Sequence, residues 1–422
     1  MNKALFLLAA LPVAMPAVAG EVTTDWADDV KKALVVYENK DTFINKVNFT
    51  YREQWQMASV QPNGSNGLHL RDTASPFNSE FRRSWIGLNM MMKSGTQFNI
   101  IGRIGGLPSR NTYTIGKNAR TKRNFTYTDI YSVWVKQNIS AVKGLSVKAG
   151  KFSPLFTSDF RMSNANIPCV ERSYVANQFG LDTNWGVEIN YTPDKNDTVF
   201  LQVMANDRAC SSKNMSHKDV YRDGRGLKGE FGWEDKCFLI LGGTHKFDVT
   251  ENGYQALSAE YIHDFNNAYH NRRKPGENNY GLGFKDAISL GYEVKQGKLT
   301  FLANAVAAFE QQVGNGSNNV GIQLQPVYSI HPQVDLVFRY NAMTGDGACK
   351  LLSADRYICT QTTASSWVDS LHAFYFGVDL YASAKHKDAA KLMFGAEYTT
   401  ARKDGADCYN GWEFTTAIRF NF

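Results

Sequence analysis

The sequence predicts an all-β chain, a transmembrane antiparallel up-and-down β-barrel of about 16 strands with a short N-terminal helix. Apolar and polar side chains alternate with period two in segment after segment, which is the pattern of strands with two different faces. The connections between these segments alternate long and short, as in a barrel with loops at one rim and turns at the other. A closed barrel gives every backbone polar group a partner, so it can cross a bilayer.

The first residues have the features of a secretory signal peptide, 1–19. Lys3 precedes an apolar run from Ala4 to Leu11, and Ala17-Val18-Ala19 is typical of a cleavage site. No other stretch approaches about 20 apolar residues, so transmembrane helices are not expected. Export combined with the barrel pattern predicts a location in the outer membrane of a Gram-negative bacterium.

One amphipathic helix is expected before the barrel. Residues 25–38 (DWADDVKKALVVYE) carry apolar side chains at helical spacing and acids in the first turn. We place this helix in a periplasmic segment, 20–42, and the barrel in residues 43–422.

The period-two pattern places strands along the whole remaining chain. The sixteen segments are 43–58, 79–93, 95–106, 125–139, 144–153, 185–193, 197–206, 234–248, 253–264, 283–295, 298–311, 319–329, 333–342, 371–383, 389–400 and 410–422. The last, WEFTTAIRFNF, puts Trp412 and Phe420 on one face and Arg419 on the other, and it ends on Phe422. A single such strand would fit a soluble sandwich equally well, but sixteen strands behind an export signal favour the barrel.

Composition excludes several other classes of function. The formal net charge of +6 is modest and no nucleic-acid-binding motif is present. Cys349 and Cys359 are a candidate disulfide, although six cysteines allow fifteen pairings. No His/Cys spacing is typical of a metal site and no G-x-S-x-G motif occurs, so neither metal, cofactor nor catalysis is expected.

Three stretches resemble the phosphate-selective porin O and P family. They are FRRSWIGLN at 81–89, TDIYSVWVKQNISAVKGLSVKAGKFSPLF at 128–156 and VERSYVANQF at 170–179, within an ordered similarity over about 79–206. The resemblance implies a sixteen-stranded, trimeric porin for small anionic or neutral solutes. It also implies that a third loop, here 154–184, folds into the lumen. PLFTSDF and Cys169 depart from the family pattern, and no multi-lysine cluster supports phosphate selectivity.

Strand parity predicts which charged side chains face the lumen. Arg52, Arg83, Arg103 and Arg419 fall on the inward parity of neighbouring strands, whereas Arg82 needs a β-bulge to join them. A basic wall of this kind raises the local anion concentration. With Lys151, these residues form the expected anion-selectivity set. Inward acids are expected on the same parity at Glu188, Glu260, Glu293, Asp379, Glu397 and Glu413.

Other interpretations of these charges remain open. The inward charges would also serve a general, non-selective porin by keeping the lumen wet and bracing it through arginine–carboxylate pairs. Glu171 and Arg172, in the expected constriction loop, are predicted to pin that loop to the wall. Basic loop residues could bind lipopolysaccharide phosphates in addition to outer-membrane lipids. A structural or adhesive surface barrel without substantial conductance is the alternative from a different class.

Overall fold

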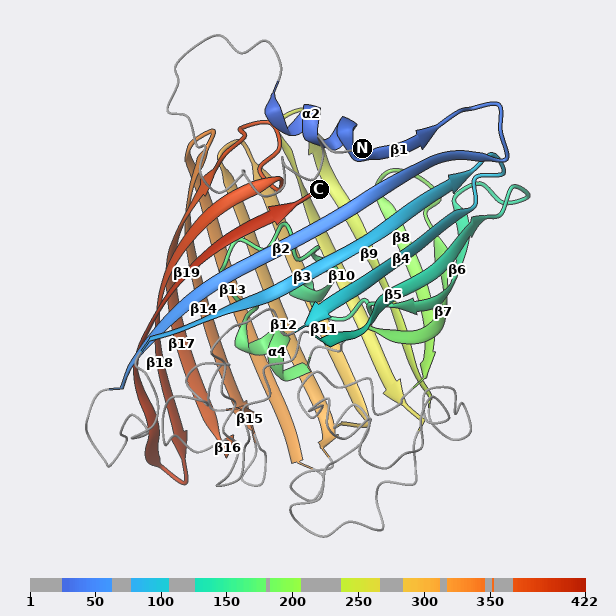
Figure 1. Ribbon diagram of the computed structural model, residues 1–422. Coiled ribbons are helices and arrows are strands. Elements are labelled where there is room, and N and C mark those ends of the chain that lie inside the picture. The colour runs from blue at the N-terminus through green and yellow to red at the C-terminus, as the bar shows by residue number, and fades with distance from the viewer. Residues whose placement is uncertain are drawn as a thin grey trace.

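The computed structural model describes residues 25–62, 77–105, 126–179, 183–205, 237–265, 284–311, 317–345, 351–352 and 367–422. Sixteen antiparallel strands pair in chain order, and the pairing of β19 with β2 closes them into a barrel (Figure 1). The strands are β2 (Ile44–Pro62), β3 (Phe77–Met92), β4 (Gln97–Gly105), β5 (Thr126–Asn138), β6 (Leu145–Phe152), β7 (Asn184–Tyr191), β8 (Asp197–Ala205), β9 (Cys237–Thr250), β10 (Gly253–Asp264), β11 (Asp286–Gln296), β12 (Leu299–Gln311), β13 (Ser317–His331), β14 (Val334–Gly345), β17 (Ser370–Tyr381), β18 (Ala390–Lys403) and β19 (Ala406–Asn421).

The predicted barrel is confirmed, and each expected strand has its counterpart. The strict alternation of long and short connections fails at the C-terminal end. The turn after β18 consists of Asp404 and Gly405, both at positive φ (51° and 77°), which is the backbone of a tight two-residue hairpin. The preceding connection, 382–389, is longer and lies at the opposite rim, which we call the turn rim; the other is the loop rim.

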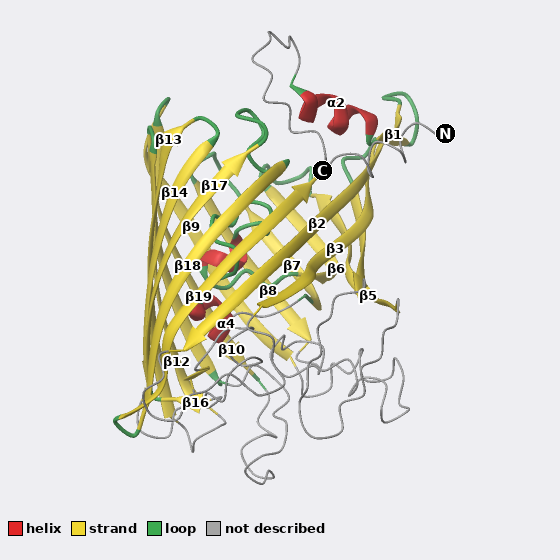
Figure 2. Cartoon of the chain, turned by 60° about the vertical axis from the view of Figure 1, so that its left-hand side comes forward, coloured by secondary structure: helices red, strands yellow, loops and turns green. Residues whose placement is uncertain are grey.

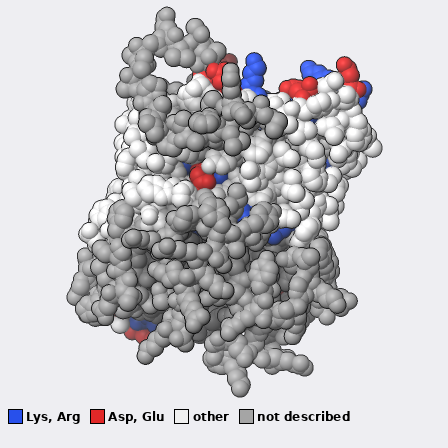
Figure 3. Space-filling model, in the orientation of Figure 1, with Lys and Arg blue, Asp and Glu red and all other residues white. Residues whose placement is uncertain are grey.

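The register separates an inner from an outer face along every strand. Outward apolar side chains such as Leu257, Leu290 and Phe376 are more than half exposed, whereas inward Arg339 and Arg419 are almost fully buried. On the side seen in Figure 3, charged groups gather at the turn rim, and the described surface below it is largely uncharged. An apolar outer face and a polar inner face are the arrangement of a barrel that contacts lipid outside and water inside.

The N-terminal helix is present but shorter than expected. Helix α2 (Trp26–Ala33) ends well before Glu38, because residues 35–38 form strand β1 (Val35–Glu38) and pair with β2. β-Branched Val35 and Val36 follow the helix directly, and such residues favour strands. Within the described residues, no helix has the length and apolar character needed to span a membrane.

Helix α2 is fastened over the turn rim, next to the C-terminus (Figure 2). The indole Nε1 of Trp26 donates to Ala382 O (3.2 Å), and its ring meets that of Phe422 edge-on at 5.9 Å. Asp28 accepts from Lys385 Nζ and from His386 Nε2, both at 2.7 Å. The helix therefore ties the 382–389 connection to the last residue of the barrel.

This fastening is expected to depend on pH. Hydrogen bonds from Lys385 and His386 lower the pKa of Asp28 below its usual value of 3.8. Because the folded-state pKa is depressed, the stabilisation is complete above about pH 3.8 and is lost as the pH falls through the lowered value. The hydrogen-exchange protection factors of residues 26–33, which correct for the intrinsic effect of pH, should fall in acid, and those of Asp28→Asn should be low already at neutral pH. Equal protection of both proteins throughout the titration would contradict this role of Asp28.

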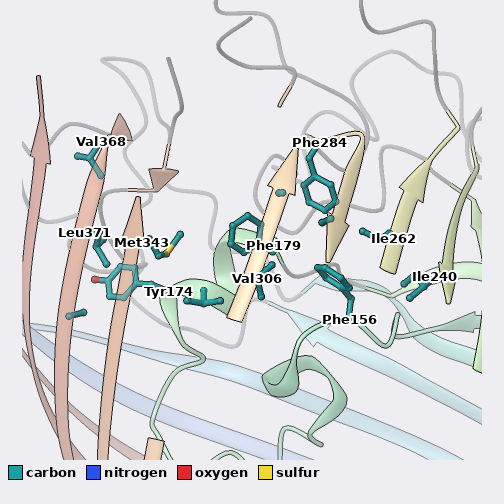
Figure 4. Close-up of a cluster of buried hydrophobic side chains, with 14 of the residues drawn as sticks. Phe156, Tyr174, Phe179, Ile240, Ile262, Phe284, Val306, Met343, Val368 and Leu371 are labelled. Atoms are coloured by element: carbon teal, nitrogen blue, oxygen red, sulfur yellow. The ribbon is translucent and has the colours of Figure 1, made fainter. Parts of the chain in front are cut away.

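The connection between β6 and β7 folds back into the barrel and carries two short helices, α3 (Ser158–Arg161) and α4 (Tyr174–Phe179). Its apolar side chains pack against inward residues of the wall toward the loop rim (Figure 4). Phe156 and Phe179 both contact Phe284, with ring centroids 6.5 and 6.4 Å apart. Between β14 and β17, the short antiparallel strands β15 (Leu351–Leu352) and β16 (Trp367–Val368) pair with each other, and Val368 belongs to this cluster. We call residues 153–183 the inner loop.

Candidate functional site: an arginine-rich wall around the inner loop

Two consecutive arginines of β3 reach the lumen because the strand contains a bulge. Gln54 pairs with Arg83 and Trp55 pairs with Phe81, so Arg82 has no register partner in β2. A bulge adds one residue and changes the direction of the side chains around it. The bulge is what allows the side chains of both Arg82 and Arg83 to face the lumen.

Both arginines contact one carboxylate of the inner loop. Arg82 Nε lies 2.8 Å from Glu171 Oε1 and Arg83 Nη2 lies 3.6 Å from Glu171 Oε2. Gln56 Nε2 donates to the same carboxylate (2.8 Å), and Arg83 Nη1 donates to Gln54 Oε1 (2.5 Å). Glu171 therefore joins the loop to the wall.

Arg419 holds the backbone of the inner loop rather than a solute. Its Nη1 donates to Asn164 O (3.0 Å) and Ile167 O (2.9 Å), and its Nη2 donates to Val170 O (3.2 Å). Its Nε bonds to Gln54 Oε1 at 3.0 Å, and only 1% of the residue is exposed. The fork of a guanidinium is suited to several fixed acceptors at once.

Sequence reasoning missed two further anchors of the loop, one on β14 and one on β18, the strand that pairs with β19. Arg339 Nη1 donates to Glu171 O (2.8 Å), and its Nη2 pairs with Glu397 (3.0 Å). Lys391 Nζ donates to Ile167 O (2.7 Å) and lies 3.6 Å from Asp379. Strand parity places Arg339 and Lys391 inward, so this signal was available, but it does not identify the loop atoms that they bind.

Arg52 and Arg103 lie at the two ends of an aromatic stack on the inner wall. The Arg52 guanidinium carbon is 4.9 Å from the Trp85 ring centroid, and Trp85 stacks on Tyr131 with centroids 3.9 Å apart. Arg103 lies 5.1 Å from the Tyr131 centroid. A register shift in the β4–β5 pairing leaves Tyr131 without a partner, which brings its ring toward Trp85. Cation–π contacts of this kind hold a guanidinium in place without neutralising it.

Arg172 is the cation that the inner loop presents beside this stack. It covers the Phe160 ring at 4.4 Å and donates to Asn164 Oδ1 (2.6 Å). Arg52 bonds to Asn421 Oδ1 (2.8 Å). Arg52 and Arg172 repel each other electrostatically, and no carboxylate of the described residues forms an ion pair with either.

The register gives Lys151 a different position from the one expected. Its partners are Val133 in β5 and Trp185 in β7, on the outward parity. Lys148 is the lysine of β6 that faces inward, where it bonds to Glu188 at 2.8 Å. The expectation that Lys151 lines the pore is therefore corrected, because alternation along β6 turns it to the outer face.

Most other inward charges brace one another. Arg161 Nη1 lies 2.8 Å from Glu260, and Lys387 Nζ lies 2.7 Å from Asp335. Glu293 accepts from Tyr254 OH at 2.6 Å. Most of the inward charged side chains therefore have the alternative role considered above, in which they brace the lumen by bonding to one another.

A cavity that can hold water remains on the turn side of the inner loop. This cavity of about 560 Å³ lies between loop residues such as Met162 and Pro168 and the wall residues Tyr254, Glu293 and Lys391. No cluster of potential metal ligands occurs in the described parts of the chain. Cys169 is buried and free. The candidate disulfide Cys349–Cys359 and the signal peptide lie outside the described residues.

The barrel and the loop inside it define the class: a sixteen-stranded β-barrel of the porin fold. The chain is similar to OprB of Pseudomonas putida, at 14% identity and a TM-score of 0.55 over 95% of this chain and 98% of that one. It is also similar to the outer membrane channel DcaP of Acinetobacter baumannii, at 11% identity and a TM-score of 0.52 over 92% and 99%. A third similar structure is an anion-selective porin from Comamonas acidovorans, at 10% identity and a TM-score of 0.52 over 89% and 99%.

These likenesses establish the fold. No protein-family model matches the chain, and no curated protein sequence matches it. Membership of the phosphate-selective porin O and P family is therefore not shown.

Proposed function

We propose that the protein is an outer-membrane pore through which small hydrophilic solutes diffuse passively, with a preference for anions. The observation that carries the proposal is the excess of arginine around the inner loop. Arg172 repels Arg52, Arg83 and Arg419 there, and the two carboxylates that the inner loop places among these arginines are Glu171 and Asp159. A wall with uncompensated positive charge attracts anions into a narrow lumen.

The arginines of this cluster have two different roles, whereas the sequence analysis assigned anion selectivity to all of them. Arg83 and Arg419 are buried and hold the loop, so we assign the preference to Arg52 and Arg172, with Arg82 and Arg103 beside them. Arginine stays charged and matches phosphate or carboxylate oxygens with two donors. The proposed solutes are accordingly small anions, phosphate-like ions included. Small neutral solutes also diffuse through the pore, without electrostatic preference.

We further propose a homotrimer in the outer membrane, with lipids at its outer wall and lipopolysaccharide at the loop rim. The apolar outward side chains support contact with lipid, since charge on that face is destabilising. Exported protein is then expected in the outer-membrane fraction and to need detergent for extraction.

Single-channel recording of the full chain in a planar lipid bilayer tests the pore itself. Discrete current steps are expected, and they should be small because the inner loop and its apolar cluster occupy much of the loop-side interior. A correctly folded barrel that gives no steps would contradict the proposal and favour a structural or adhesive surface barrel.

A further inference from the structure

The cavity on the turn side of the inner loop has the size of a binding site for a small organic molecule. It measures about 560 Å³ and lies between the inner loop and the inner wall of β10 to β14. Cavities of about 300–1,000 Å³ with a few well-placed polar groups are typical of ligand sites. The side chains of this wall therefore show which solute the cavity can hold.

The strand register places an acid, an apolar residue and an amide side by side on that wall. Glu293 in β11 pairs with Leu302 in β12, and Leu302 pairs with Gln325 in β13. Lys295 lies two residues from Glu293 on the same face of β11, about 7 Å nearer the turn rim. All four residues line the cavity, so a carboxylate, an ammonium group and an amide surround the side chain of Leu302.

The two opposite charges of β11 are available to a solute. Tyr254 OH donates to Glu293 Oε1 (2.6 Å), which fixes the carboxylate, and no described residue donates to Glu293 Oε2. Lys295 is exposed to the lumen, and it forms no ion pair with any carboxylate of the described residues. Glu293 and Lys295 are thus a fixed carboxylate and a neighbouring ammonium group that both face water.

Gln325 adds a buried donor without an acceptor. Its Oε1 accepts from Gln323 Nε2 (3.2 Å) and from Cys169 Sγ (3.5 Å), whereas its Nε2 donates to no atom in the described part of the chain. Only 2% of the residue is exposed. A buried donor that lacks a partner costs free energy, and a carbonyl group of a solute in this cavity would satisfy it.

The other charged side chains of the cavity are already bonded within the chain. They are Arg161, Asp335, Lys387, Asp388 and Lys391. Selectivity in the cavity therefore depends on Glu293, Lys295 and Gln325, with the apolar side chains of Leu302 and Val327 between and beside them.

We infer that this cavity binds a short zwitterionic peptide of about two residues. Lys295 attracts an anion but Glu293 repels it, so the pair favours a solute that carries both charges. An extended dipeptide spans about 7 Å, which matches the spacing of Glu293 and Lys295. Its ammonium group would bind Glu293, its carboxylate Lys295 and a carbonyl oxygen Gln325, while an apolar side chain would contact Leu302. This site goes beyond the proposed anion preference, which other residues carry.

Calorimetric titration of the full chain in detergent with glycyl-leucine tests the inference. Saturable binding is expected. N-acetyl-glycyl-leucinamide, which has the same backbone and side chain but neither charge, should bind at least tenfold more weakly because it loses both charged hydrogen bonds. No saturable binding of glycyl-leucine to the folded barrel, or equal binding of the uncharged peptide, would overturn the inference.

Two variants assign each end of the peptide to its residue. Glu293→Gln should weaken the binding of glycyl-leucine roughly tenfold or more but leave that of N-acetyl-glycyl-leucine unchanged, because this peptide has no ammonium group. Lys295→Gln should weaken glycyl-leucine in the same way and leave glycyl-leucinamide, which has no carboxylate, unchanged. Glu251→Gln, at an exposed acid of the β9–β10 turn, is the matched control and should have no effect. Variants that weaken every peptide equally, or none, would reject these contacts.

Bilayer recording separates this inference from the proposed function. Glycyl-leucine added on the turn side should interrupt the single-channel current of the wild type at lower concentration than that of Glu293→Gln. Current steps without any effect of the peptide would reject the site and leave the pore. Calorimetric binding by a barrel that gives no current steps would reject the pore and support the site.

Discussion

Replacing Arg419 by alanine is expected to release the inner loop from the wall and to widen the pore. The wild-type guanidinium satisfies carbonyls of Asn164, Ile167 and Val170 in a site closed to solvent. Each hydrogen bond to a charged donor contributes about 1.5–3 kcal/mol, so about 3 kcal/mol or more of the loop's attachment should be lost. Single-channel current should rise and become noisier, and hydrogen exchange of residues 163–172 should accelerate.

The control for this substitution is Arg402→Ala. Arg402 is an exposed arginine of β18 whose side chain pairs with Asp407 at the loop rim, away from the inner loop. It should leave both readouts unchanged. Arg419→Lys, which retains the charge but not the fork, should fall between wild type and alanine. Unaltered current and protection in Arg419→Ala would show that the remaining anchors, Arg83, Arg339 and Lys391, hold the loop alone.

Reversing the charge of both Arg52 and Arg172 is expected to convert an anion-preferring pore into a cation-preferring one. A unit charge about 6 Å from a passing ion contributes about 0.7 kcal/mol in water. The two reversals change the local charge by four units, which disfavours a passing anion by about 2.8 kcal/mol and favours a cation by about the same amount. The anion-to-cation permeability ratio should therefore fall by up to roughly ten-thousand-fold without screening, and by less as salt screens the field. The zero-current potential of Arg52→Glu/Arg172→Glu measures this.

Two control variants accompany that experiment: one keeps the charge but changes the shape of the side chain, and the other reverses a charge far from the lumen. Arg52→Lys keeps the charge and should keep the preference. Lys385→Glu, at an exposed position of the turn rim, changes the net charge by the same amount as one reversal but lies in open solvent. It should have little effect, because water and salt screen it. A double reversal that leaves selectivity unchanged would remove Arg52 and Arg172 from the mechanism.

The barrel could be predicted from the sequence because its periodicity is local. Side chains alternate along a strand wherever it lies, so Trp412 and Arg419 reveal their faces without knowledge of the neighbours. The end of α2 was predicted less well, since Tyr37 fits the helical spacing and only its pairing with Val47 shows it to be in a strand. The two-residue turn at Asp404-Gly405 did have a local signal, since Asp-Gly favours such hairpins.

The site could be predicted only in part, because parity reports direction and not contacts. Strand parity correctly predicted that the side chains of Arg52, Arg83 and Arg419 point toward the lumen. It could not show that Arg83 and Arg419 are occupied by the inner loop, since Glu171 and Val170 are far from them in sequence and meet them only after the loop folds back. Lys151 was included without a parity argument, and the register contradicts it.

The zero-current potential of the wild-type pore across a tenfold potassium chloride gradient tests the central claim most directly. The account predicts a potential with the sign of chloride preference at about 0.1 M salt, decreasing as both solutions are made more concentrated because screening weakens the field of Arg52 and Arg172. A potential with the sign of potassium preference, or one of zero, would contradict it.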